Sequence, residues 1–584
     1  MEALRVMELN HSQIEFPLSW PNQILRSLRI RCLDFCRLGT GLSSMLGHMT
    51  QLETLSLFQS TLADDQSPTE IAQLSNLKLL DLSVKSSLHP LPNGILSSLK
   101  KLEELYLGSR DHLQLGRDKE EEIGCLKEIS AISNLAWLQI VLYGLNLLLL
   151  SLQEFDTQSL SRFNITVTNH GGAINLNRSY QFQKSFNLYL KGGGDEGLKQ
   201  VFDPKVTSIV ERTENLILNL SYSSRLRNLM PNLDENGFIN LKKLDLYYGH
   251  CECLIDFIAN LIAKHIFENL VSTELEYLKL KEICYGFLPP GCFNQLQEVT
   301  LYCISALECL WKGSVEPPSL CNLKSISVSG CHHITTLFSQ LALKCLVKLQ
   351  KIYVFDCENL KRIALREKSL AEEVLELPQL KVFALRRTSF IGFDSKYDKA
   401  VALSNQVNTK NTLKHFLSQY VNYIFKINVS SVIFVATMLI SLEELKVRGC
   451  SEMCEVIGEE DEEVSQEDNA QHHDIGKRRE IALGKTSKEF VFPRLSSLQL
   501  ERLKNLRRFS GSHQEDYEFK FSLLTTLILV SCPKLKKFCS GKLDAPWLKK
   551  VQIGPIYIEN FEAPVDLKLS KLQSLQRYKI EYSM

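Results

Sequence analysis

The sequence predicts an α/β solenoid built from short stacked strands, and three observations lead to that prediction. First, a Leu-x-x-Leu-x-Leu hexapeptide begins at Leu52, Leu77 and Leu102, so its period is 25 residues, from 52 to 77 to 102. Second, further copies begin at Leu241, Leu275, Leu495 and Leu524. Third, copies that accept Ile, Val, Met or Phe begin at Leu4, Leu135, Leu160, Leu296, Leu323, Leu349, Leu380, Leu442 and Leu548.

A period of roughly 20–29 residues built on this hexapeptide defines the leucine-rich repeat, in which each unit supplies one short parallel strand. We therefore predict a leucine-rich-repeat solenoid, or horseshoe, with a parallel β-sheet on the concave face. Loops or short helices, such as residues 71–74 and 95–99, should return the chain along the convex face. Such an array offers a surface for recognition, and nothing in the hexapeptide indicates a catalytic pocket.

Side chains alternate between the two faces of a strand, which assigns a direction to each residue of the hexapeptide. Leu105 and Leu107 should point into the core, and Tyr106 between them should point outward. Stacking of successive repeats then aligns the outward residues about 4.8 Å apart. The outward positions are therefore the predicted ligand surface.

Interruptions of the hexapeptide divide the chain into four predicted segments. They are N-terminal repeats 1–205, middle repeats 206–385, an irregular insertion 386–440 and C-terminal repeats 441–584. Residues 407–440 of the insertion lack the hexapeptide and are rich in Asn, Lys, Phe, Ile, Tyr and Val. We interpret residues 407–440 as translated intron sequence from a faulty gene model, a hypothesis that sequencing of the transcript would test.

Two further regions depart from the repeat pattern. Residues 171–197 contain Gly-Gly runs and only a faint repeat near 186–190. Residues 458–489 begin with an acidic run and end with basic residues at 477–479. High charge with few large apolar residues predicts a flexible acidic loop over 458–489.

Composition and charge restrict the class of protein. Lys plus Arg and Asp plus Glu are balanced at 67 each, so no net field attracts nucleic acid or anionic lipid. The first residues show no secretory signal. The longest apolar stretches, 145–152 and 429–440, fall short of the ~20 residues that span a bilayer. We therefore expect a cytoplasmic protein with no membrane span and no nucleic-acid partner.

The 17 cysteines form an odd-numbered set without a secretory signal, which argues against a disulfide framework. Several of them occupy one repeat position, three residues after the last apolar residue of the hexapeptide. This group consists of Cys331, Cys357, Cys450 and Cys532. The repeat reserves this position for Asn or Cys. We expect these thiols to be structural.

Motifs for catalysis or metal binding are weak. Gly484-Lys485-Thr486 resembles part of a phosphate-binding loop, but Arg479 stands where the motif requires glycine. The densest metal-type groupings lack the paired spacing that fixes a coordination geometry. These groupings are Cys331-His332-His333, Cys251-x-Cys253 and His472-His473. No nucleophile elbow is present. We therefore predict a non-enzymatic protein without metal or cofactor.

Candidate partner contacts lie at the outward positions of the predicted strands. They are Tyr106, Lys279, Thr300, Tyr302, Ser327, Tyr353, Phe355, Lys446, Arg448 and Gln499. Exposed aromatic side chains are typical of interface hot spots, although packing between neighbouring strands is an equal alternative for the aromatic members. The C-terminal lysines from Lys534 to Lys550 are interpreted as a solvated face, or alternatively as a docking surface for an acidic partner.

Several segments resemble the leucine-rich-repeat region of plant coiled-coil nucleotide-binding immune receptors, the disease resistance proteins. The opening residues 1–9 resemble the first repeat after their nucleotide-binding module, and residues 74–83 and 99–107 are similar to their early repeats. Residues 442–450 and 529–535 match their irregular cysteine-type repeats. The resemblance implies a repeat array that restrains a nucleotide switch and senses a pathogen effector or a guarded host protein.

The chain departs from that family because it contains neither a P-loop nor the nucleotide-binding module. We therefore expect a fragment that retains recognition and autoinhibition, with the nucleotide-binding module of an immune receptor as one partner. The alternative is a leucine-rich-repeat adaptor, such as the substrate-recognition subunit of a ubiquitin ligase. That reading is weakened because no helical docking box precedes Leu4.

Overall fold

The computed structural model describes most of the chain in segments. These are residues 4–14, 26–63, 69–85, 91–108, 119–154, 160–169, 182–190, 203–219, 236–258, 266–313, 315–365, 377–390, 441–457, 488–510, 517–535, 543–554 and 556–558. The molecule consists of two compact units, Met1–Cys251 and Glu252–Met584. The fourfold division expected from the sequence stays a prediction.

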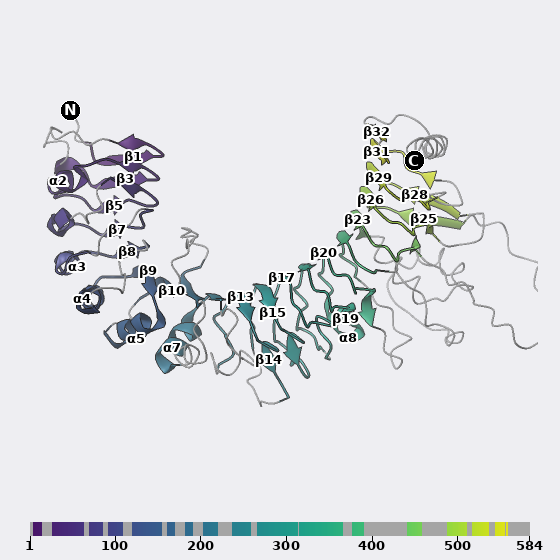
Figure 1. The fold of residues 1–584 in the computed structure, drawn as a ribbon, viewed down its shortest axis with the longest axis horizontal. Coiled ribbons are helices and arrows are strands. Elements are labelled where there is room, and N and C mark those ends of the chain that lie inside the picture. The colour runs from purple at the N-terminus through teal and green to yellow at the C-terminus, as the bar shows by residue number, and fades with distance from the viewer. Residues whose placement is uncertain are drawn as a thin grey trace, which may run out of the picture. The chain divides into compact units, whose positions relative to one another are not determined.

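The first unit is a ladder of parallel strands, each paired with the next one along the chain (Figure 1). The register aligns Leu55 with Leu80 and Leu80 with Leu105, as the repeat of the hexapeptide requires. The strands are β1 (Val6–Asn10), β3 (Ile30–Asp34), β5 (Thr54–Ser56), β7 (Leu79–Asp81), β8 (Glu104–Leu107), β9 (Trp137–Tyr143), β10 (Arg162–Thr168), β11 (Lys184–Tyr189), β12 (Asn215–Asn219) and β13 (Lys243–Gly249).

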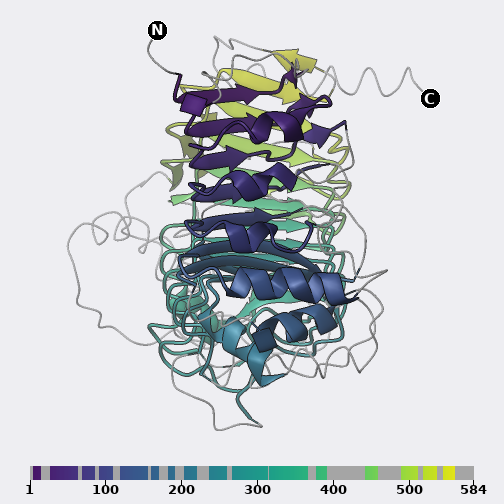
Figure 2. The ribbon, with the colours of Figure 1, turned by 90° about the vertical axis from the view of Figure 1, so that its left-hand side faces the viewer.

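Short helices return the chain along one face of this sheet. Figure 2 views that face and shows the helices stacked one above another, nearer to the viewer than the strands. The expected convex helices at 71–74 and 95–99 are confirmed as η1 (Thr69–Gln73) and α3 (Ile95–Ser98). The others are α2 (Leu42–Leu46), α4 (Lys119–Ser130), α5 (Leu145–Glu154) and α7 (Pro204–Arg212). A small parallel sheet joins β2 (Gln13–Ile14), β4 (Arg37–Leu38) and β6 (Thr61–Leu62).

The second unit repeats the parallel ladder. They are β15 (Ser272–Leu278), β17 (Glu298–Tyr302), β18 (Ser325–Ser329), β20 (Lys351–Phe355), β22 (Val382–Arg386), β23 (Glu444–Arg448), β26 (Ser497–Glu501), β29 (Thr526–Val530) and β31 (Lys550–Ile553). β32 (Ile556–Ile558) adds to β31 antiparallel. β22 pairs directly with β23, so the repeats on either side of the expected insertion stack as consecutive repeats. Residues 391–440 lie outside the described part of the chain.

Short second strands, rather than helices, line most of the return path in this unit, which the sequence did not lead us to expect. They form the pairs β14 (Ile255–Asp256) with β16 (Cys284–Tyr285), β19 (Thr336–Ser339) with β21 (Arg362–Leu365), and β24 (Glu455–Ile457) with β27 (Arg508–Ser510), and a three-stranded set of β25 (Lys488–Phe492), β28 (Tyr517–Phe521) and β30 (Leu543–Asp544). Ser339 caps the N-terminus of helix α8 (Gln340–Cys345), because its side chain accepts from the amide of Ala342.

Alternating burial along each strand shows where the core lies. In β26, Leu498 and Leu500 are fully buried, whereas Ser497, Gln499 and Glu501 are half-buried. The same alternation holds for β17, β18, β20, β23 and β29. Burial of each inward leucine is worth about 1.5–3 kcal/mol. The leucines of the hexapeptide therefore fill the interior of the solenoid.

One repeat was assigned to the wrong residues from the sequence. The repeat assigned to begin at Leu275 begins five residues earlier, because β15 pairs Thr273 with Val299 and Leu275 with Leu301. Thr273 therefore occupies an inward position, where its methyl group replaces that of a valine. A second inward position, in β3, is held by Arg31, which is fully buried; burial lowers the pKa of its guanidinium to about 10.

The strands end at a recurring turn that positions the cysteines. Two residues after the second inward residue the backbone adopts positive φ, for example 53° at Cys303 and 56° at Asp356. Buried cysteines come next, and the thiols of Cys331 and Cys357 donate to the carbonyls of Ser329 and Phe355 at 3.6 and 3.3 Å. These contacts agree with the expected structural role of the thiols.

Candidate protein-interaction surface

The register of the second unit aligns its outward side chains in three rows across the strands. From β15 to β26, the row at the strand starts contains Ser272, Glu298, Ser325, Lys351, Val382, Glu444 and Ser497. The middle row contains Glu274, Thr300, Ser327, Tyr353, Ala384, Lys446 and Gln499. The row at the strand ends contains Glu276, Tyr302, Ser329, Phe355, Arg386, Arg448 and Glu501.

Most of the residues predicted as partner contacts take places in these rows. The middle row holds Thr300, Ser327, Tyr353, Lys446 and Gln499, and the strand-end row holds Tyr302, Phe355 and Arg448. The structure thus brings eight of the ten predicted residues onto one face of one sheet. Contact of any of them with a partner stays a prediction.

The other two predicted residues do not belong to this face. Lys279 is exposed, but it follows the last residue of β15, because the repeat begins at Leu270 rather than Leu275. Its assignment to the outward row was therefore a register error. Tyr106 lies in the first unit on β8 and is only 4% exposed. The ring of Trp137 lies 5.8 Å from the Tyr106 ring, and the Tyr106 hydroxyl donates to Glu104 at 2.8 Å.

Aromatic side chains flank a strip of small residues. Tyr302 is 38% exposed and makes an edge contact with Tyr277, with ring centroids 5.2 Å apart. Two strands further, Tyr353 and Phe355 lie with their ring centroids 6.2 Å apart. All three outward residues of β18, between these aromatic pairs, are half-buried serines. We call the strip formed by Ser325, Ser327 and Ser329 the serine strip.

The turn after β18 also carries a small residue. Gly330 has a φ of +66°, a conformation that side chains other than glycine rarely adopt. A Cβ at this position would lie 2.8 Å from the sulfur of Cys303. The strand-end row therefore has its lowest relief at Ser329 and Gly330, between Tyr302 and Phe355.

Arginine side chains gather beside the aromatic pair of β20. Asp356 accepts from Arg386 at 2.6 Å and from Arg387 at 3.3 Å. The Arg386 guanidinium also lies 5.0 Å from the centre of the Phe355 ring, within cation–π range. Asp356 therefore holds two arginines in place while neutralising only one positive charge.

The positive character continues onto the next strand. Lys446 pairs with Glu444 at 2.6 Å, and Arg448 pairs with Glu501 at 3.4 Å. The side chains of Arg386, Arg387, Lys446 and Arg448 are between 41% and 70% exposed. Exposed ion pairs of this kind contribute about 0–1 kcal/mol to stability, so these side chains are available to respond to a ligand.

The far side of the serine strip has the opposite sign. Glu274 and Glu276 project from β15, and Glu298 projects from β17. The outward face of β15 to β23 thus changes from acidic, through the serine strip, to aromatic and basic.

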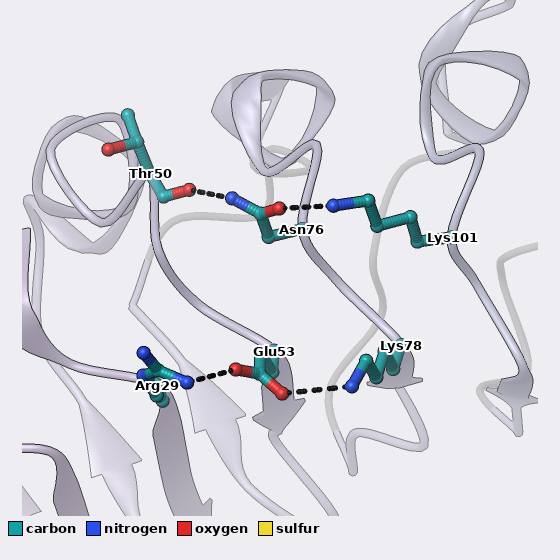
Figure 3. Close-up of polar contacts among 6 residues, drawn as sticks. All are labelled: Arg29, Thr50, Glu53, Asn76, Lys78 and Lys101. Atoms are coloured by element: carbon teal, nitrogen blue, oxygen red, sulfur yellow. Dashed lines mark hydrogen bonds and ion pairs between the residues drawn. The ribbon is translucent and has the colours of Figure 1, made fainter.

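Polar ladders in the first unit connect neighbouring repeats beside the strands (Figure 3). Glu53 accepts from Arg29 at 3.0 Å and from Lys78 at 3.1 Å, and these two partners lower the pKa of the Glu53 carboxyl. Asn76 donates to the carbonyl of Thr50 at 3.0 Å and accepts from Lys101 at 2.7 Å. These ladders link one repeat to the next.

On the strands of the first unit, amide side chains form a similar ladder. Asn187 donates to Asn164 at 3.0 Å, and Asn164 donates to Gln139 at 3.4 Å. Arg162 pairs with Glu104 at 2.9 Å and covers the Trp137 ring at 5.1 Å.

Within the described ranges, no group of three or more His, Cys, Asp or Glu side chains is arranged to hold a metal ion. Burial raises the pKa of the Cys450 thiol, and burial raises that of Cys309 to about 11. Such thiols stay protonated near neutral pH, which suits packing rather than nucleophilic chemistry. The Gly484–Thr486 tripeptide and the His472–His473 pair lie outside the described residues.

No helix in the described part of the chain has the length and apolar character needed to cross a bilayer.

The sequence did not identify Arg386, Arg387 or Asp356 as site residues. The expected insertion was placed from residue 386, which hid the last residue of β22 and its turn. The available signal was the match between Leu385-Arg386 and Val447-Arg448, because both arginines follow the second inward residue of a repeat.

Comparison with known proteins identifies the class of repeat. Residues 213–358 match the family described as plant disease resistance protein RPS2-like, leucine-rich repeats. The resemblance to plant resistance proteins stated from the sequence is therefore confirmed over these residues. A search of curated proteins found no match.

Solved structures with similarity to the chain are leucine-rich-repeat proteins. A leucine-rich-repeat protein of Leptospira interrogans is 19% identical, with 63% of this chain and 87% of that chain covered and a TM-score of 0.33. The ectodomain of the Arabidopsis receptor kinase HAESA, solved with a peptide hormone, is 14% identical, with 93% and 78% covered and a TM-score of 0.34. A TDR receptor is 14% identical, with 94% and 84% covered and a TM-score of 0.37.

Proposed function

We propose that the chain is the protein-recognition and autoinhibitory leucine-rich-repeat module of a plant intracellular immune receptor. It acts in defence, in the cytoplasm, and has no enzymatic activity. It is the repeat portion of a receptor, and the nucleotide-binding module of that receptor lies outside this chain. A pathogen effector, or a host protein altered by one, is the proposed ligand of the outward rows. The match of residues 213–358 to plant disease resistance repeats carries this proposal.

The outward face of the second unit supports the recognition part of the proposal. Parallel strands hold their outward residues at fixed spacing, so a partner meets a preformed surface and little ordering entropy is lost on binding. Outward aromatic and arginine side chains, the residue types enriched in hot spots, lie together on β17, β20, β22 and β23. Autoinhibition follows if the array binds the resting nucleotide-binding module more tightly than the active one, because a ligand shifts an equilibrium only through differential affinity.

Co-expression tests the proposal directly. The chain and the nucleotide-binding module of a plant receptor of this class are expressed as separate polypeptides in plant cells, and co-precipitation and defence signalling are measured. We expect association, and a lower signalling output from an autoactive module when the chain is present. Absence of both effects, with the chain abundant and folded, contradicts the proposal. Recovery of ubiquitin-ligase core subunits instead would favour the adaptor alternative.

A further inference from the structure

We propose that the outward face over β17, β18, β20, β22 and β23 binds an extended acidic segment of a protein partner, with one large apolar side chain of that segment seated on the serine strip. This inference deepens the proposed recognition function and rests on it. Charge, relief and preorganisation of the side chains each support it.

Charge selects an acidic occupant. Strands β20 to β23 and the turn after β22 present five cationic side chains, which are Lys351, Arg386, Arg387, Lys446 and Arg448. The anionic side chains on the same strands and turns are Asp356 and Glu444, with Glu501 on the next strand. A positive excess therefore remains after the carboxylates of Asp356, Glu444 and Glu501 are subtracted. Carboxylates accept two parallel hydrogen bonds from an arginine, which makes arginines the preferred partners of an acidic segment.

The low surface over the serine strip fits an apolar side chain that lies next to the acidic side chains of the bound segment. Tyr302 and Phe355 lie on strands separated by β18, and strand spacing places these rows about 10 Å apart. That distance accommodates one leucine or phenylalanine side chain between the two rings, above Ser327 and Ser329. Contact with Tyr302 would remove a ring that is now 38% exposed from water.

The arginine side chains are already ordered before a ligand binds, which favours specific binding rather than attraction by charge alone. Asp356 fixes Arg386 and Arg387 from one side, and the Phe355 ring supports Arg386 from below. Side chains that are already ordered lose less entropy when a ligand binds. Glu274, Glu276 and Glu298 beyond the serine strip repel the acidic end of the segment. The segment should therefore have one orientation, with its carboxylates over β20 to β23.

A nucleic acid is the less favoured occupant. The acidic side chains of β15 and β17 interrupt any basic stripe that a nucleic acid would follow across the sheet. Nucleic-acid surfaces carry basic residues clustered on one face without such interruption.

Fluorescence anisotropy of the full chain tests the inference with a defined probe. The probe is a fluorescein-labelled synthetic peptide that carries one phenylalanine among several glutamates, and the control peptide carries lysines instead. We expect the acidic peptide to bind and the lysine peptide not to bind. The double variant R386E/R448E should weaken binding about tenfold or more, because two attractive contacts become repulsive. No binding of the acidic peptide to the unmodified chain overturns the inference.

Two matched controls separate site binding from general electrostatics. The variant K504E/R507E makes the same change in charge at exposed positions of a turn outside the outward rows. It should leave peptide affinity within about twofold, whereas equal losses in the two double variants contradict a defined site. Ser327→Trp fills the serine strip without altering charge and should reduce affinity, and Thr526→Trp on β29 should not. Equal effects of the two tryptophans would refute the role of the serine strip.

Folding and the alternative ligand are checked with the same proteins. Circular dichroism and thermal melting should coincide for all variants, because every substituted side chain lies outside the leucine core. A single-stranded oligonucleotide that displaces the peptide and binds more tightly overturns the choice of an acidic protein segment. Failure of peptide binding while the co-expressed nucleotide-binding module still associates refutes this inference alone and leaves the proposed function standing.

Discussion

Adjacent leucines in β7 provide a direct measure of how much the inward positions stabilise the solenoid. Leu80 is fully buried, and the register stacks it between Leu55 and Leu105. Leu79 points to the opposite face and is half-buried. Leu80→Ala and Leu79→Ala therefore delete the same atoms one residue apart, so they differ in environment alone.

The expected costs follow from burial. Loss of the buried Leu80 side chain forfeits a transfer free energy of about 1.5–3 kcal/mol. A cavity adds to this cost, because Leu55 and Leu105 belong to strands fixed by backbone hydrogen bonds and cannot collapse into the space. We expect about 2–5 kcal/mol in total for Leu80→Ala and less than about 1 kcal/mol for Leu79→Ala.

Hydrogen–deuterium exchange of the full chain is the suitable assay, because repeat arrays open locally and a single unfolding midpoint does not describe them. The opening free energy of peptides that cover residues 69–85 should fall by the amounts given for each variant. Equal losses in both variants, or a larger loss for Leu79→Ala, would refute the assignment of inward and outward faces.

Three further predictions concern the contacts between repeats. Asn322→Ala should lower the local opening free energy, measured by hydrogen–deuterium exchange, by about 0.5–1.5 kcal/mol, because the Asn322 amide donates to the carbonyl of Asn294 at 2.7 Å. Asn294→Ala keeps that carbonyl and should change little, and the reverse order would contradict this contact between repeats. Alkylation followed by peptide mapping should modify exposed Cys454 rapidly and buried Cys450 only after unfolding, and similar rates would show that Cys450 is not packed as described. Because the pKa of Glu53 is lowered in the folded chain, the ionised carboxyl stabilises the fold above its ordinary pKa of 4.5, and this contribution is lost as the pH falls through the folded value. Glu53→Gln should therefore be less stable than the unmodified chain at neutral pH and equally stable in acid. A stability difference that stays constant across pH would exclude this ion-pair contribution.

The repeat architecture was predictable because its signal is redundant. The same inward position recurs in many copies, for example at the fully buried Leu498 and Leu527. The period therefore remains visible even where single copies lack the expected leucine. The prediction failed where residue type and position disagreed. Thr273 fills an inward place that apolar spacing assigns to leucine, and Arg31 fills another that no apolar pattern reveals.

The candidate surface was predictable in position but not in organisation. Alternation along a strand identified Tyr353 and Lys446 as outward residues, because that property depends only on the backbone. The ion pairs of Asp356 with Arg386 and Arg387 depend on the turn geometry. The cationic neighbours on β23 depend on the pairing of β22 with β23 across the expected insertion. Burial of Tyr106 likewise depends on Trp137, which reaches it from the next strand. Such contacts between repeats are not encoded in the hexapeptide.

Hydrogen–deuterium exchange of the full chain with and without the acidic phenylalanine peptide tests the central claim most directly, namely that the outward strand face of the second unit is the recognition surface. We expect slower exchange in peptides that cover residues 298–302, 325–329, 351–355, 382–386 and 444–448. Slower exchange confined instead to the second strands on the return path, at 255–256, 284–285, 336–339 and 362–365, would contradict it.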